Sequence, residues 1–449
     1  MTRRTIALAL ALLLAPLGAQ AEDLLQTYDL ARNSDPQYAA AEAGRLSTRE
    51  GAVQSRAAFL PQISGNVSSR YSSTTTRLNN GLTGDSDSGG HGYGLEVAQS
   101  IFDLGDIERH RAQTELSKSA DFQLEAAGDS LITRTSAAYF NVLIAMETLS
   151  AAEAQEAALK KQFDFADKRL EVGLAPITDV HEARAQYDSA RANTLVTRNA
   201  LEDAYRALEE ITGKDIRALN ALPQDFHPNL PSEKSAEDWV QAAIDNNPTL
   251  KAKELAVHAA DISVDAARAG HLPTLGLRAG YSHGRPFADI GGAFRTQHSD
   301  TSDVSVTLSI PIFSGGATQS RVRQAIAERD VASDQLEQQK RALVRNTRSA
   351  YNALVAGISE VEARKSAVFS ARSAYEASQV GLEVGTRTVL DVLTNQQNLF
   401  NAEREYARSR YGFLQNQLLL EQAAGTLDLD DVKAINAQLS AEATLKTAP

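Results

Sequence analysis

The sequence predicts an α+β membrane protein in which pairs of β-strands alternate with very long helices. Three observations carry this prediction: an internal repeat, two pairs of segments with alternating apolar residues, and two proline-free runs of helix-forming residues. A repeat of this kind indicates two copies of one half-fold joined in a single chain.

The internal repeat has a period of about 212 residues, which is far too long for a solenoid. The repeated positions include prolines, glycines, a tyrosine and an aspartate. They are Pro36 and Pro248, Leu60-Pro61 and Leu272-Pro273, Tyr139 and Tyr351, Gly173 and Gly385, Asp179 and Asp391, and Gly213 and Gly425. Since the offset hardly varies, the two halves are expected to share one architecture.

Four segments alternate apolar and polar residues with a period of two. In 303–312, Val304, Val306, Leu308 and Ile310 alternate with small polar residues, and 62–73, 93–102 and 274–282 follow the same pattern. This pattern over about ten residues is typical of membrane strands with one face in lipid and one toward a polar lumen. A half-buried soluble hairpin is the alternative. The polar segments 72–92 and 283–300 are expected to be surface loops.

The runs 105–172 and 317–384 lack proline and are rich in helix-forming residues. Each could form roughly 100 Å of helix. A Val-Gly break ends each run, and a second helix follows with apolar residues at sevenfold spacing. In the second half these are Val392, Leu399, Tyr406 and Phe413, with Leu393, Phe400, Ala407 and Leu414 beside them; in the first half they are Val180, Tyr187, Leu201 and Leu208, with Thr194 interrupting the series. Heptads predict two long coiled-coil hairpins with the Val-Gly breaks as their turns.

Composition limits the compartment and the partners. The formal net charge is −12, so no nucleic-acid partner is expected. Residues 1–21, with Arg3 and Arg4 before an apolar run and Ala19 and Ala21 at a cleavage site, are predicted to be a secretory signal peptide. The chain has no cysteine, so packing or assembly rather than disulfides must stabilise it.

Two strands in each half give four per chain, and four strands cannot close a barrel around a lumen. An open sheet edge cannot lie in hydrocarbon, because its backbone groups would lack hydrogen bonds. The strands therefore predict an oligomer, without setting the number of chains.

Several segments together resemble the TolC family of trimeric outer-membrane exit ducts of Gram-negative bacteria. They are "LPQISGNVSSRYS", "SIFD", "TSAAYFNVL", "VGLAPITDVHEARAQYDSA", "GHLPTLGL", "PIFSGG" and "VGTRTVLDVL". The resemblance implies a homotrimer with a shared 12-stranded transmembrane β-barrel, four strands per chain, continuous with a periplasmic α-helical barrel. It also implies a periplasmic adaptor protein, an inner-membrane pump of the RND, ABC or MFS type, and contact with outer-membrane lipid.

On this basis the chain divides into nine segments. These are a signal peptide (1–21), a helix of the first repeat (22–59), barrel strands 1 and 2 (60–103), a coiled-coil hairpin (104–212), an equatorial segment (213–235), a helix of the second repeat (236–271), barrel strands 3 and 4 (272–314), a second coiled-coil hairpin (315–424) and an equatorial and C-terminal segment (425–449).

The resemblance also assigns candidate functional residues at the periplasmic entrance. It implies adaptor docking at the hairpin tips, which are Val172, Gly173, Leu174, Val384, Gly385 and Thr386. It implies gate links between neighbouring hairpins at Thr178, Asp179 and Arg387, and a selectivity ring of three copies of Asp391. Asp391 lies off the apolar stripe, with Asn395 and Asn398 on its face, which fits a luminal direction.

Two positions depart from the family pattern. Thr394 stands where the family has a second luminal aspartate, and Leu382 stands where a tyrosine joins the entrance network. The first change predicts that one carboxylate ring is missing. The second predicts a more weakly closed entrance.

No catalytic, cofactor or metal motif was found. Asp85, Asp87, Gly90 and Glu96 have the spacing of a calcium loop, but Gly89 supplies no side-chain ligand and the flanks are predicted strands, so a solvated loop tip is the better interpretation. An enzyme and a bound cofactor are therefore not expected. The remaining alternative function is an exported coiled-coil scaffold or adhesin with a soluble β-domain.

Overall fold

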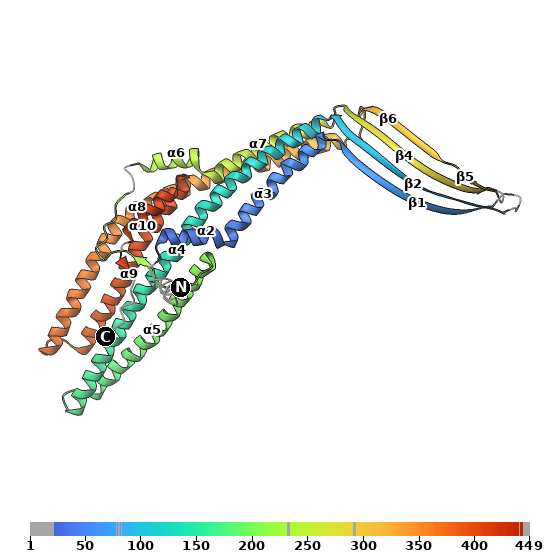
Figure 1. Cartoon of the computed structure of the whole chain (residues 1–449). Coiled ribbons are helices and arrows are strands. Elements are labelled where there is room, and N and C mark those ends of the chain that lie inside the picture. Colours follow the sequence, from blue (N-terminus) through green and yellow to red (C-terminus); the bar gives the residue numbers. More distant parts are fainter. Residues whose placement is uncertain are drawn as a thin grey trace, which may run out of the picture. The chain divides into compact units, whose positions relative to one another are not determined.

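The computed structural model describes residues 22–77, 79, 81, 83–230, 234–290, 293–439 and 441–442. The predicted signal peptide, residues 1–21, lies outside the described residues. The helices are α2 (Leu24–Ser34), α3 (Pro36–Arg56), η1 (Ala57–Phe59), α4 (Leu104–Glu171), α5 (Ile177–Thr212), α6 (Ala236–Asn246), α7 (Pro248–Ala269), α8 (Ala317–Glu383), α9 (Val389–Ala424) and α10 (Leu429–Gln438). The strands are β1 (Gln62–Arg77), β2 (Thr83–Phe102), β3 (Asn220–Ala221), β4 (Thr274–Ile290), β5 (Ala293–Thr296), β6 (Ser299–Ser309) and β7 (Ala441–Glu442) (Figure 1).

The chain forms two compact units. Of the described residues, the first contains those within 22–42, 124–248 and 339–442, and the second contains those within 43–123 and 249–338. The first unit holds both helix–turn–helix tips and the small β3–β7 pair, whereas the second holds the large sheet. None of the described helices combines the length and the apolar composition needed to cross a bilayer.

The helix expected over 22–59 is two helices: α2 ends at Ser34, α3 begins at Pro36, and Asp35 lies between them. The segment 236–271 is divided in the same way into α6 and α7 at Asn247 and Pro248. The residue before a proline is disfavoured in the α region, which explains both breaks. The prediction of one continuous helix in each segment was wrong at this point.

The two proline-free runs form α4 and α8, each a single helix, as the composition predicts. The following helices α5 and α9 end at Gly213 and Gly425, both in the left-handed conformation. The heptad positions of α9 are largely buried, including Val392, Phe400 and Leu414. Thr194, which interrupts the apolar series of α5, is also buried, and its hydroxyl donates a hydrogen bond to the Ala190 carbonyl at 3.1 Å. A threonine can occupy this position because its polar group is satisfied within its own helix.

The main core of the first unit contains large side chains from α4 and α9. Tyr139 and Tyr411 are fully buried, and the ring of Phe140 stacks on Tyr411 at 5.9 Å. The Tyr139 hydroxyl donates to the Asn220 carbonyl at 2.8 Å and accepts from the Asn220 amide at 2.9 Å. This pair of hydrogen bonds fixes β3 against the middle of α4.

An ion pair between a buried arginine and a partly exposed glutamate connects the same two helices. Arg410 of α9 donates through Nη2 to both carboxylate oxygens of Glu147 on α4, at 2.8 and 2.6 Å. The Tyr411 hydroxyl donates to Glu147 at 3.0 Å, and Nη1 of Arg410 donates to the Pro223 carbonyl at 3.0 Å. The Arg410 side chain is only 4% exposed, so Glu147 is needed to balance its charge.

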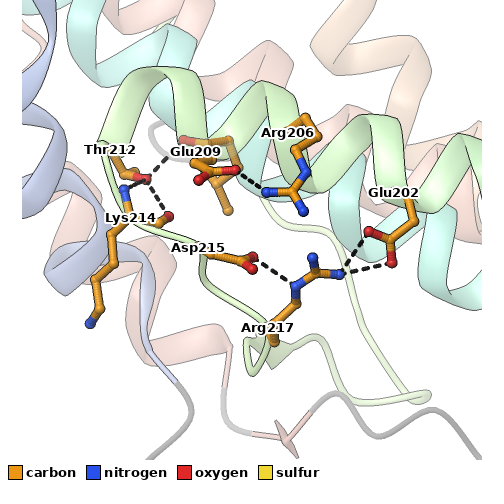
Figure 2. Close-up of polar contacts among 8 residues, drawn as sticks. Glu202, Arg206, Glu209, Thr212, Lys214, Asp215 and Arg217 are labelled. Carbon is orange, nitrogen blue, oxygen red and sulfur yellow. Dashed lines mark hydrogen bonds and ion pairs between the residues drawn. The ribbon is translucent and has the colours of Figure 1, made fainter.

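A second, more exposed ionic cluster fixes the chain where it leaves α5 (Figure 2). Arg217 donates to Glu202 at 2.8 and 3.0 Å and to Asp215 at 2.7 Å, and its guanidinium lies 4.5 Å from the centre of the Tyr205 ring. The hydrogen bonds that the guanidinium donates to these two carboxylates raise the pKa of Arg217. The cluster folds the segment after Gly213 back along the last turns of α5.

The large sheet of the second unit is antiparallel, with β1 paired to β2 and β2 paired to β4. Both β5 and β6 pair with the other edge of β4, β6 along Thr274–Gly284 and β5 along Phe287–Ile290. The pairing offset with β4 is the same for β5 and β6. Between the two strands, the Gln297 amide donates to the Pro286 carbonyl of β4 at 3.0 Å and continues the ladder. They therefore act as one interrupted fourth strand beside β4 (Figure 1).

The register gathers the alternating apolar residues on one face. Ile63 lies opposite Val97, Val97 opposite Ala279 and Ala279 opposite Val304. Within one chain this face has no cover, and Ile63, Val67 and Val304 are 68%, 88% and 76% exposed. The other face is polar and includes an ion pair between Arg278 and Glu96 at 2.8 Å. The predicted division into an apolar and a polar face is therefore present in the structure.

The strands are longer than the sequence pattern predicted. Most of the expected loops 72–92 and 283–300 belong to strands, because β1 continues to Arg77 and β2 begins at Thr83. The calcium-like set of Asp85, Asp87, Gly90 and Glu96 therefore lies in a paired strand and not at a loop tip. Among the described residues, no group of three or more His, Cys, Asp or Glu side chains could hold a metal ion.

Candidate functional site: the two hairpin tips

The turn between α4 and α5 begins as a helix C-cap. The Gly173 amide donates to the Leu170 carbonyl at 2.9 Å, and the Leu174 amide donates to the Arg169 carbonyl at 2.7 Å. This pair of bonds is the Schellman motif, which needs a residue in the left-handed region at its centre. Gly173 has φ +73°, a conformation that costs glycine nothing.

The turn between α8 and α9 repeats this geometry. The Gly385 amide donates to the Leu382 carbonyl at 3.2 Å, and the Thr386 amide donates to the Gly381 carbonyl at 2.8 Å. Gly385 has φ +80°. The two Val-Gly sequences therefore form the same turn in both halves.

The predicted docking residues form apolar ends on both hairpins. Val172, Leu174 and Val384 are each about two-thirds exposed. Ile177 and Leu390, in the first turns of α5 and α9, are also more than half exposed. Exposed aliphatic side chains at the end of a helical hairpin are suited to contact with another protein.

Asp391 closes a capping box at the start of α9. Its Oδ2 atom accepts from the Thr388 amide at 2.9 Å and from the Thr388 hydroxyl at 2.9 Å, and its own amide donates to the Thr388 hydroxyl at 3.2 Å. These bonds, together with the nearby Arg387 charge, lower the pKa of Asp391 below its ordinary value. The carboxylate is therefore ionised at neutral pH.

Asp179 occupies the corresponding position of α5, but no capping box forms there. The N-cap residue is Pro176, which has no side-chain hydrogen-bonding group. Among the described residues, neither the Asp179 carboxylate nor the exposed Thr178 hydroxyl has a hydrogen-bond partner. The two aspartates at corresponding helix positions are thus in different states, one used as a helix cap and one available to another group.

Arg387 lies in the turn between α8 and α9, and its side chain is exposed. Its aliphatic part packs over Gly381, where a Cβ atom would come within 2.6 Å of the Arg387 Cγ. The first hairpin has the reverse arrangement: Arg169 is on the helix and donates to the Leu174 carbonyl at 3.3 Å, while Ala175 is in the turn. Within the described part of the chain, the Arg387 guanidinium forms no hydrogen bond or ion pair.

The two positions that depart from the family pattern lie beside this site. The Thr394 hydroxyl donates to the Leu390 carbonyl of its own helix at 2.8 Å, so it replaces a charged group with a satisfied neutral one. Leu382 provides the carbonyl that caps Gly385 and has no side-chain hydrogen bond to offer. Thr394 therefore does not supply the carboxylate, and Leu382 does not supply the tyrosine hydroxyl, that the family pattern has at these positions.

The helices behind the tips pack on one another. Leu159 of α4, Ala190 of α5 and Leu393 of α9 form one apolar cluster, and Gln155 donates to Gln397 at 2.6 Å. The rings of Phe163 and Tyr187 stack with centres 6.3 Å apart. The apolar cluster and the Gln155–Gln397 bond link the two hairpins, whereas the ring stack holds α4 to α5 within the first hairpin.

Sequence reasoning missed two residues of this site. One is Thr388, although the Thr-x-x-Asp spacing before an apolar run is a known signature of a capping box. The other is Gly381, whose importance depends on the position of the Arg387 side chain and has no sequence signal of its own.

Comparison with known proteins agrees with this architecture. The family model described as "Outer membrane efflux protein" matches residues 27–214 and 239–426. The chain is 36% identical to outer membrane protein TolC of Escherichia coli over 432 residues, which cover 94% of this chain and 86% of that protein. It is 30% identical to the alkaline protease secretion protein AprF of Pseudomonas aeruginosa, with 95% and 89% covered.

The fold is also similar to a solved structure, that of the CmeC outer membrane channel of Campylobacter jejuni. The TM-score is 0.74 at 19% identity, with 94% of this chain and 90% of that chain covered. The chain therefore belongs to the outer membrane efflux protein family and is a TolC-like outer-membrane protein.

Proposed function

We propose that three copies of this chain form one gated exit duct in the outer membrane. The duct passes drugs, small toxic molecules or proteins from an inner-membrane pump to the exterior. The outer-membrane location and the exit-duct class follow from the family match and from the relatives, which are outer-membrane, efflux and secretion proteins and not enzymes. The number of chains and the details of the gate are the proposed part.

One structural observation carries the assembly: a four-stranded sheet with one bare apolar face. Such a face is stable in lipid, but the free edges of β1 and β6 are not. Pairing β1 of one copy with β6 of the next satisfies both edges. Three copies would give a 12-stranded barrel, and the twofold match of the family model supports an internal repeat that supplies two strands per half.

Family members work with adaptor proteins and inner-membrane transporters in tripartite pumps and secretion systems. For this chain we propose that a periplasmic adaptor docks on the exposed apolar tips at Val172, Leu174 and Val384. The transporter would be of the RND, ABC or MFS type. The name of the relative AprF refers to protease secretion, which supports a role in type I secretion beside drug efflux.

Fractionation tests the proposed class. The protein should sediment with the outer membrane, resist extraction by salt and dissolve only in detergent, where it should run as a heat-modifiable band. Recovery of the wild-type chain in the soluble periplasmic fraction would contradict the duct and favour an exported scaffold or adhesin.

We further propose that Arg387 holds the entrance shut by binding Asp179 and Thr178 of a neighbouring hairpin. The support is that all three groups lie at the tips without a hydrogen-bond partner among the described residues. A guanidinium can bind a carboxylate and a hydroxyl together, because its donors form a rigid fork.

Replacing Arg387 with serine should raise single-channel conductance in planar bilayers. Each lost exposed link is worth at most about 1 kcal/mol, so the increase should be a fewfold change and not full opening. The increase should also be smaller than in a relative that keeps the tyrosine replaced here by Leu382. Arg169→Ser, which removes the arginine of the other tip, is the matched control and should leave conductance unchanged. Equal conductance in wild type and Arg387→Ser would contradict the proposed link.

Three copies of Asp391 around one axis should form a cation-selective ring, since rings of carboxylates favour cations in pores. Because Thr394 removes the second ring, most of the preference should depend on Asp391. The substitution Asp391→Asn should therefore abolish most cation selectivity in bilayer recordings and weaken block by multivalent cations.

Asparagine keeps an oxygen that can accept from Thr388, so the substitution changes the charge and retains the cap. Thr388→Ala is the complementary control: it removes the cap, keeps the charge and should preserve selectivity. Unchanged selectivity in Asp391→Asn would show that Asp391 does not face the lumen.

A further inference from the structure

The apolar face of the large sheet changes character along its length. Near the ends that connect to helices, the cross-strand pairs are apolar, such as Leu275 with Leu308 and Leu277 with Val306. Toward the opposite end of β4 the same face becomes aromatic and then basic. A row here is a line of cross-strand neighbours that runs across the sheet, and the change takes place over four successive rows on this face.

The basic row contains Ser69, His91, Arg285 and His298 and is called the cationic row below. His91 lies opposite Ser69 on one side and Arg285 on the other. The unbroken register of β5 and β6 along β4 places His298 opposite Arg285. All four strands therefore contribute a hydrogen-bonding side chain to one line across the sheet.

Aromatic rings border the cationic row on both sides. On the helix-connected side, Tyr93 stacks on His283 at 5.1 Å and lies 6.5 Å from Tyr281. On the other side, the rings of Tyr71 and Phe287 are 6.5 Å apart. The Phe287 ring lies over Gly89, where an added Cβ would approach it within 2.7 Å, so glycine provides its space.

The charge of Arg285 is not balanced within the sheet. Its side chain is exposed and makes no ion pair among the described residues. The nearby carboxylate, Asp300, is already held by His283 at 2.7 Å and by the Tyr281 hydroxyl at 3.0 Å. On the same row, the Ser69 hydroxyl is the one side-chain hydrogen-bond partner of His91 among the described residues, at 3.3 Å. Arg285 and His91 can therefore turn toward an anion, and His298, whose ring packs edge-on against His283 at 6.4 Å, lies beside them on the exposed face.

The height of the row matches a membrane boundary. Arg285 follows Leu275 by ten residues on β4, which is roughly 33 Å along a strand and about 25 Å across a membrane at a tilt of about 40°. An apolar band of about 25 Å with aromatic girdles is the usual dimension of an outer-membrane barrel. The cationic row thus lies where hydrocarbon gives way to headgroups.

We propose that the cationic row binds the phosphate groups of a phosphorylated lipid in the outer leaflet. The proposal rests on the proposed function, because it requires this face to meet lipid. Arg285 would bind a phosphate through its forked donors, with His91, His298 and Ser69 adding hydrogen bonds. The flanking tyrosines would lie at the level of the headgroups, where aromatic side chains are favoured.

The test counts lipid A on the assembled protein. Full-length wild type and variants are reconstituted in phosphatidylcholine nanodiscs that contain lipid A, and bound lipid A is measured by native mass spectrometry. The triple variant Arg285→Gln, His91→Gln and His298→Gln should bind lipid A at least about tenfold more weakly, since the loss of one charge-assisted hydrogen bond alone has about this effect. Wild type should show the same loss with dephosphorylated lipid A.

Arg70→Gln is the matched control, because Arg70 lies one position from the cationic row on β1 and therefore on the opposite face. It should bind lipid A as wild type does. Equal binding by the triple variant, or equal binding of dephosphorylated lipid A, would overturn the proposal while leaving the duct intact. Failure of the wild type to enter nanodiscs at all would instead overturn the proposed function, and this inference with it.

Discussion

Val306→Arg should block insertion of the sheet into the outer membrane. Val306 is 62% exposed on the apolar face and lies opposite Leu277. Arginine near the middle of a lipid-facing band costs about 2–4 kcal/mol per chain, and three copies would carry this cost together. The expected result is loss of the detergent-resistant assembly and accumulation of degraded or periplasmic chain. Leu277→Arg and Leu308→Arg should behave in the same way.

The control for this substitution lies one residue away. Thr307, opposite Gly276, projects to the polar face, so Thr307→Arg should insert almost normally. Both variants introduce the same side chain at nearly the same depth. Equal loss of assembly from both would show that the two faces of the sheet do not differ in their environment.

Glu147→Ala should lower the free energy of unfolding of the helical unit by about 3 kcal/mol. The change leaves the Arg410 guanidinium buried, with the Pro223 carbonyl as its remaining hydrogen-bond acceptor among the described residues, and it removes the acceptor of the Tyr411 hydroxyl. Although the Glu147 side chain is 36% exposed, its removal strands the charge of the buried Arg410, and a stranded buried charge costs more than the intact pair contributes. Urea denaturation of the detergent-solubilised protein, followed by helix circular dichroism, measures the shift.

Glu153→Ala is the matched control on the same helix. Glu153 pairs with Arg198 at 2.8 Å, but the Arg198 side chain is 55% exposed. Exposed pairs contribute at most about 1 kcal/mol, so this variant should unfold close to wild type. A Glu147→Ala variant as stable as Glu153→Ala would mean that burial does not determine the importance of the Arg410 pair.

The long helices and their turns could be predicted from the sequence because each depends on local signals. The absence of proline sets the extent of α4 and α8, and glycine in the left-handed conformation marks the ends at Gly173 and Gly385. The breaks at Pro36 and Pro248 carry a local signal as well, because the residue before a proline is disfavoured in the α region.

The full length of the strands could not be predicted in the same way. Glycines at 84, 89, 90, 92 and 94 give β2 a composition typical of a loop, yet these residues pair with β1 or β4 throughout. Their strand conformation depends on neighbours that are distant in sequence. Tertiary context overrides local preference at such positions.

The candidate site was predicted as a set of positions, and the structure adds what each side chain does within one chain. Sequence similarity treats Asp179 and Asp391 as equivalent, whereas only Asp391 has a threonine at its N-cap. The difference between Pro176 and Thr388 is visible in the sequence. Its consequence for the two carboxylates requires the geometry of the turns.

The mass of the detergent-solubilised complex tests the central claim most directly. A sheet that cannot close by itself requires several copies, and the proposed barrel requires three. Native mass spectrometry of the wild-type protein extracted from outer membranes should give a protein mass of three mature chains. A mass of one chain, or recovery of the chain without detergent, would contradict the shared barrel and the duct built on it.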